Sequence, residues 1–100
     1  VVRKEFAEKY PEQFKKFIDE YNESVAYTSS NVDETAQLIA DYGVVASATI
    51  AKKALPKCHI VCYTNNDMKD ALKGFLKVLY DQNPKSVGGS MPEDDFYYEY

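Results

Sequence analysis

Both cysteines and the only histidine of the chain lie in one short segment, residues 58–62. Thiolate and imidazole are common zinc ligands, so this segment is the first candidate for a metal site. If the segment is a strand, Cys58 and Cys62 share one face about 13 Å apart, and His59 points to the other face. That geometry supplies too few ligands for a metal and too long a span for a disulfide. We therefore predict no metal site and interpret both cysteines as free, buried thiols.

Other residue types that could support catalysis lack partners nearby. His59 could act as a general base, but its sequence neighbours supply no serine, so a buried, hydrogen-bonded imidazole is the simpler interpretation. The glycine pair at 88–89 lacks the Lys and Ser/Thr of a phosphate-binding loop and indicates a turn or hinge. We therefore predict that the chain is not an enzyme, has no catalytic residue and needs no cofactor. Ligand-binding residues cannot be assigned from these patterns.

The C-terminal segment is acidic and rich in tyrosine. Three adjacent carboxylates at 93–95 could bind a cation, but adjacent carboxylates in a tail are more often solvated. Aromatic side chains near a terminus can stack on a ligand, yet they more often attach the tail to its own domain. This expectation concerns Tyr97, Tyr98 and Tyr100.

Composition limits the classes of partner. The chain has 100 residues and a net charge of −4, so a nucleic-acid surface, which needs a basic patch, is not expected. Lysine pairs at 15–16 and 52–53 are interpreted as solvated helix faces. No apolar run is long enough to span a membrane. The chain begins without Met, and we expect it to be a piece of a longer protein.

Residues 11–27 are predicted to form the helix around which the rest is organised. Pro11 suits its first position, and apolar residues recur at i, i+3, i+4, i+7 and i+11. This spacing predicts one buried stripe, with the charged residues on the other side. Replacing Phe17 in the middle of the stripe by Ala is expected to cost about 3–5 kcal/mol of stability. The stripe consists of Phe14, Phe17, Ile18, Tyr21 and Val25.

The remaining periodic segments predict shorter helices, and cap residues indicate where they begin and end. Asn31 followed by Glu34 imitates a capping box, and a polar break of four residues predicts an antiparallel helix pair. Gly43 stands where a left-handed cap is needed, and Ser47 can cap the next helix. The predicted helices span about 3–9, 11–27, 32–42, 48–55 and 66–82, with a tail over 84–100.

One internal strand is predicted over about 58–63, and Val1–Val2 is interpreted as the end of a second one. Apolar residues on both faces of the first segment favour burial on both sides. The expected fold class is therefore mainly α with one or two short strands, in a single domain or lobe fragment over 1–100.

The order of these segments resembles one known family. VVRKEFAEKYPEQFKKFIDEY, NVDETAQLIADYG, KKALPKCHIVCY, NDMKDALKGFLKVLYDQNPKSVGG and DDFYY together resemble the C-terminal third of ABC-transporter solute-binding proteins of the nitrate/sulfonate/taurine type, whose relatives include thiamine-pyrimidine precursor synthases. The resemblance covers nearly the whole chain but concerns packing positions, not ligand contacts.

The resemblance implies a fragment of a lobe of the type II periplasmic-binding-protein α/β fold. In that family two lobes close on a solute at a hinge, and the protein hands the solute to a membrane permease. The implied partners are the rest of its own chain, an ABC permease and, for the whole protein, a small-molecule solute. The implied location is extracytoplasmic, either periplasmic or as a cell-surface lipoprotein. The cysteine-rich iron-binding motif of the related enzymes is missing from these residues.

Two functions from different classes follow, and a precursor-synthase-like enzyme is a third that the missing cysteine cluster disfavours. The first is part of a solute-binding protein that is not competent to bind ligand alone, because half a cleft cannot enclose a solute. The alternative is a free-standing, helical protein-interaction module. For a fragment with strand edges left unpaired, we also expect self-association at high concentration.

Overall fold

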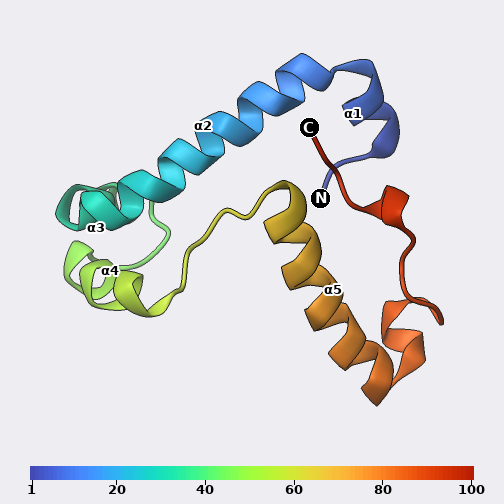
Figure 1. Cartoon of the computed structure of the whole chain (residues 1–100). Coiled ribbons are helices and arrows are strands. Elements are labelled where there is room, and N and C mark those ends of the chain that lie inside the picture. Colours follow the sequence, from blue (N-terminus) through green and yellow to red (C-terminus); the bar gives the residue numbers. More distant parts are fainter. The chain divides into compact units, whose positions relative to one another are not determined.

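A computed structural model describes residues 1–100 and shows a mainly helical chain, as the sequence predicts (Figure 1). The chain forms two compact units, Val1–Cys62 and Tyr63–Tyr100. That both belong to one domain stays a prediction. None of the helices combines the length and the apolar composition needed to cross a membrane. The first unit contains α1 (Lys4–Lys9), α2 (Pro11–Ser30), α3 (Val32–Asp41), α4 (Ala48–Ala54) and the 3₁₀ helix η1 (Leu55–Lys57); the second contains α5 (Asn65–Gln82) and the 3₁₀ helices η2 (Pro84–Val87) and η3 (Asp94–Phe96).

Helix α2 is longer than the sequence predicts. Pro11 occupies its first turn, where the missing N–H costs no hydrogen bond. The helix continues three residues beyond the predicted end at 27, and hydroxyl groups in this last turn bond to carbonyls of the preceding turn. Thr28 Oγ1 donates to the Val25 carbonyl at 2.7 Å, and Ser30 Oγ donates to the Ala26 carbonyl at 3.0 Å. These residues therefore extend the helix instead of breaking it.

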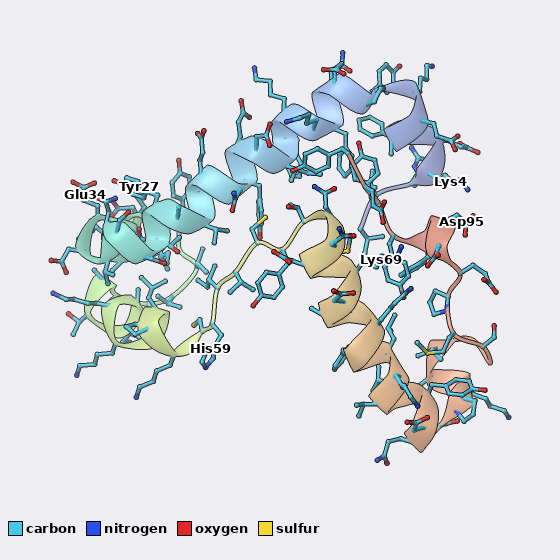
Figure 2. All side chains as sticks on the ribbon, in the orientation of Figure 1. Lys4, Tyr27, Glu34, His59, Lys69 and Asp95 are labelled. Atoms are coloured by element: carbon cyan, nitrogen blue, oxygen red, sulfur yellow. The ribbon has the colours of Figure 1, made fainter.

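Only Asn31 separates α2 from α3, so the predicted four-residue link is wrong. The predicted capping box is also wrong, because the Asn31 side chain makes no cap bond and its backbone lies outside the extended region typical of such caps. The Asn31 amide instead donates to Ser30 Oγ at 3.0 Å. Glu34 accepts a hydrogen bond from the Tyr27 hydroxyl (Figure 2), which connects α2 to α3 by another route.

The predicted caps between α3 and α4 are confirmed. Gly43 has φ +71°, and the N–H groups of Gly43 and Val44 bond to the carbonyls of Ala40 and Ile39. This is the Schellman pattern that ends a helix with a left-handed glycine. Ser47 Oγ then accepts the Ile50 N–H at 3.3 Å, as expected of an N-cap.

The core of the first unit lies between α3 and α4 and is built from small residues. Ala36 and Ala51 are only 1% and 2% exposed, which indicates close approach of the two helices. Their polar edges are joined by an ion pair of 2.5 Å between Lys52 and Asp33. Larger apolar side chains of the same two helices, such as Leu38 and Ile50, remain about half exposed, at 49% and 52%.

Neither predicted strand is present. Residues 58–64 and Val1–Val2 have no regular structure, because a strand needs a partner for its backbone groups and neither segment has one in this chain. His59 also has φ +49°, a left-handed conformation that strands do not use. The Cys58 N–H is bonded to the Leu55 carbonyl in a 3₁₀ turn. The prediction of one or two short β-strands is therefore wrong.

In the second unit, α5 ends before Pro84, as predicted, and η2 follows at once. Gly88 and Gly89 have φ +84° and +94°, so the chain turns at two residues that tolerate this conformation. Residues 90–100 then return beside α5, within the same unit. This return positions the acidic, tyrosine-rich tail.

Candidate functional site

The segment 58–62 does not assemble a metal or acid–base site. Both cysteines are free; Cys58 is exposed and Cys62 is half-buried, so the prediction of buried thiols fails for Cys58. The Cys58 thiol donates to the Ala54 carbonyl at 3.3 Å. No group of three or more histidine, cysteine or acidic side chains is arranged to hold a metal ion.

His59 is exposed, which overturns the prediction of a buried, hydrogen-bonded imidazole. It lies at the edge of an open hollow of about 280 Å³ within the first unit. No carboxylate contributes to the lining, so no acidic group orients the imidazole as in a catalytic triad. The hollow is lined by Thr28, Ser29, Val32, Leu55, Pro56, His59 and Ile60.

The apolar stripe of α2 is the first surface of functional interest. No residue of this helix is buried, although its spacing predicts a buried face. Phe17 and Tyr21 are 59% and 52% exposed. Their rings stack along the helix surface with centroids 6.2 Å apart, and the Phe17 ring also stacks on that of Phe14, with centroids 6.4 Å apart. The prediction that Phe17 belongs to a core is therefore wrong for this chain by itself.

The C-terminal tail is the second surface, and the expectation that its tyrosines attach it to the domain is confirmed for Tyr97. This side chain is 5% exposed and lies in the second unit next to two lysines of α5. Lys73 Nζ lies 5.4 Å and Lys69 Nζ 6.0 Å from the centroid of the Tyr97 ring. These are cation–π distances. The Tyr97 hydroxyl has no hydrogen-bond partner.

The same two lysines pair with carboxylates of the tail, and Figure 2 shows Lys69 projecting from α5. Asp94 lies 2.9 Å from Lys73 and 3.4 Å from Lys69, and Glu99 lies 3.2 Å from Lys69. Hydrogen bonds from Lys73 and then Lys69 lower the pKa of Asp94. The hydrogen bond to Glu99, followed by that to Asp94, raises the pKa of Lys69. The predicted solvated carboxylates are thus partly engaged in ion pairs.

Sequence reasoning did not single out the α5 residues of this arrangement, which are Asn65, Lys69 and Lys73. A usable signal was present in their spacing of four residues, which places them in one line on a helix. The acidic tail carries the opposite charge to the two lysines and could therefore pair with them. The pairing joins positions about 30 residues apart, so no local pattern in the tail points to these lysines.

A comparison with protein-family models, with curated proteins and with solved structures finds no match to this chain. The resemblance to solute-binding proteins therefore stays a prediction.

Proposed function

We propose that this chain is a helical part of one lobe of an extracytoplasmic solute-binding protein that delivers a small molecule to an ABC importer. Its partners are then the remainder of its own chain and, through the whole protein, a membrane permease. The proposal rests on the order of segments in the sequence and on one observation, the exposure of Phe17 and Tyr21 in the apolar stripe of α2. By itself the chain is proposed not to bind a solute.

The stripe supports a role in packing against other polypeptide. Burying a large apolar side chain gains about 1.5–3 kcal/mol relative to leaving it in water. Phe17 and Tyr21 are more than half exposed, so most of that gain is not realised within the first unit. In a larger lobe, a sheet or a neighbouring helix covers such a face.

The same stripe also favours a second candidate function, a free-standing helical module that binds another protein. An amphipathic helix that lays its apolar face into a groove uses anchors at i, i+3, i+4 and i+7, and Phe14, Phe17, Ile18 and Tyr21 have this spacing. The two proposals differ in what covers the stripe, a segment of the same gene product or a separate protein.

Determination of the complete reading frame, followed by calorimetry, separates the two proposals. We expect a longer product with an export signal. We expect saturable solute binding by that product and none at micromolar affinity by residues 1–100, because specific pockets enclose most of a ligand. A native product limited to these residues contradicts the solute-binding proposal and leaves the interaction module. Saturable micromolar binding of a solute by residues 1–100 contradicts both.

A further inference from the structure

The contacts between α5 and the tail follow a regular register. We call Asn65, Lys69 and Lys73 the α5 row, and residues 94–100 the strap. The row residues are four apart and therefore lie in one line on the helix surface. Their partners occur in reversed order, so the strap runs antiparallel to the helix. The contacts are Tyr100 N to Asn65 Oδ1 at 2.8 Å, Glu99 Oε1 to Lys69 Nζ at 3.2 Å, and Asp94 Oδ1 to Lys73 Nζ at 2.9 Å.

The strap is not stretched to reach these partners. Eight residues of α-helix rise about 12 Å, whereas six residues of extended chain can span about 20 Å. The strap begins with the turn η3, which takes up the extra length. Its register is therefore set by the side-chain pairs and not by a taut connection.

The row selects a definite chemistry. Two ammonium groups receive carboxylates, and an aromatic ring lies within cation–π distance of both. The ring belongs to Tyr97, which is 5% exposed, and its hydroxyl has no partner. A segment that fits this row thus carries two carboxylates with a tyrosine or phenylalanine between them.

The charged contacts of the strap can be exchanged for equivalent contacts with another segment. Asp94 and Glu99 are 75% and 53% exposed, and an exposed ion pair changes an equilibrium by no more than about fivefold. The strap is connected through Gly88 and Gly89, where an added Cβ would meet no atom within 4 Å. These glycines can absorb a change of backbone direction without a clash.

We propose that the α5 row is a recognition surface for an acidic peptide segment with an aromatic residue between its carboxylates, and that the strap occupies this surface in cis. Displacement of the strap opens the row to a second segment of the same chemistry. The proposal does not depend on the function proposed above, because it concerns only contacts within the second unit.

A peptide with the sequence of residues 93–100, EDDFYYEY, tests this recognition in trans. The host is the 100-residue chain with D94K/E99K, whose strap is repelled by the lysines of the row. We expect the peptide to bind this host at millimolar concentration, measured by chemical-shift changes at Lys69 and Lys73. We expect wild type to bind about twofold more weakly, because its own strap competes at an effective concentration on the order of millimolar, close to the dissociation constant of the peptide. Added salt should weaken binding to the host.

Charge reversal and a matched control make the test specific. A peptide with lysines at positions 94 and 99 should not bind the D94K/E99K host, because its lysines repel Lys69 and Lys73. The same peptide should bind the chain with K69E/K73E, where the charges of the row are reversed. Lys77 continues the spacing of the row but pairs with Asp81 at 2.8 Å, so K77Q in the host should leave binding unchanged.

Equal binding to wild type and to D94K/E99K contradicts occupation by the strap. If the host keeps its helix content by circular dichroism but does not bind the peptide, recognition of an acidic segment by the α5 row is contradicted. Recognition is also contradicted if the lysine-substituted peptide does not bind the K69E/K73E chain. If D94K/E99K loses helix content, D94N/E99Q serves as the host and the same outcomes apply.

Discussion

Helices α2 and α5 have similar sequence patterns but different surroundings. They contain 20 and 18 residues, and each carries an apolar stripe with charged residues beside it. Along α5 the chain returns within the same unit, and Leu72 and Leu76 are half-buried. Within the first unit no segment covers the middle of α2, where Phe17 stays exposed.

This difference shows that an amphipathic pattern predicts a face that can be buried, but not the segment that buries it. On α5 the covering segment is supplied locally, after a glycine turn, by the last residues of the chain. Its carboxylates pair with Lys69 and Lys73 of α5. Within the first unit, α2 has no equivalent cover where Phe17 lies. The two units are therefore expected to respond differently to the loss of an aromatic ring, because Tyr97 of the second unit is nearly buried and Phe17 of the first is exposed.

The largest effect is expected at the strap. Tyr97→Ala should destabilise the second unit by about 3 kcal/mol, because it removes a large, nearly buried ring. Hydrogen exchange of the α5 amides during urea titration localises the loss. Phe75→Ala is the matched control, since Phe75 lies on α5 and is 62% exposed. A similar loss in both variants contradicts the view that the strap stabilises this unit.

A much smaller effect is expected on α2. Phe17→Ala in the 100-residue chain should change stability by less than about 0.5 kcal/mol, as exposed substitutions do. Ala51→Leu is the positive control in the same unit; it overfills a buried site and should cost about 1–3 kcal/mol. Urea unfolding followed by circular dichroism measures both. Phe17→Ala can also be made in a longer native product. If it costs about 3–5 kcal/mol of stability there but not in the 100-residue chain, the segment that covers Phe17 belongs to the longer product.

The smallest effect is expected from pH. Lys69 and Lys73 face Asp94 and lower its pKa, so the stabilisation from this carboxylate is complete above its unfolded pKa and is lost as the pH falls through the folded value. The pKa of Lys69 is raised by Glu99 and Asp94, so that contribution is lost only as the pH rises above the ordinary lysine range. Protection of the strap amides, measured relative to their intrinsic exchange rates at each pH, should therefore fall at both extremes. A fall in this protection between about pH 5 and 9 contradicts this assignment of groups.

Local chemistry predicted the helices and several of their ends. The 3.6-residue period located all five α-helices, and Pro11, Gly43, Ser47 and Pro84 each act where their conformational preferences require. These features depend on neighbours within a few residues. They can therefore be predicted from sequence without knowledge of tertiary contacts.

Features that need a distant partner were predicted poorly. The segment 58–63 has the composition of a strand, but without a second strand it forms a turn with His59 in a left-handed conformation. Asn31 has the sequence of a capping box, but Glu34 bonds to Tyr27 instead. The row on α5 required pairing of residues about 30 positions apart, such as Lys69 and Glu99, which no local pattern encodes.

The hydrogen bond between the Tyr100 N–H and Asn65 Oδ1 brings the end of the second unit to its beginning. Residues 63–100 therefore form a nearly closed loop, with the glycine turn at 88–89 far from the junction in sequence. A circular permutant that joins the two ends by a short linker and opens at this turn keeps the contacts of the α5 row and strap. For the same reason, this unit is suited to insertion into a surface loop of another protein, because both of its ends can leave from one place.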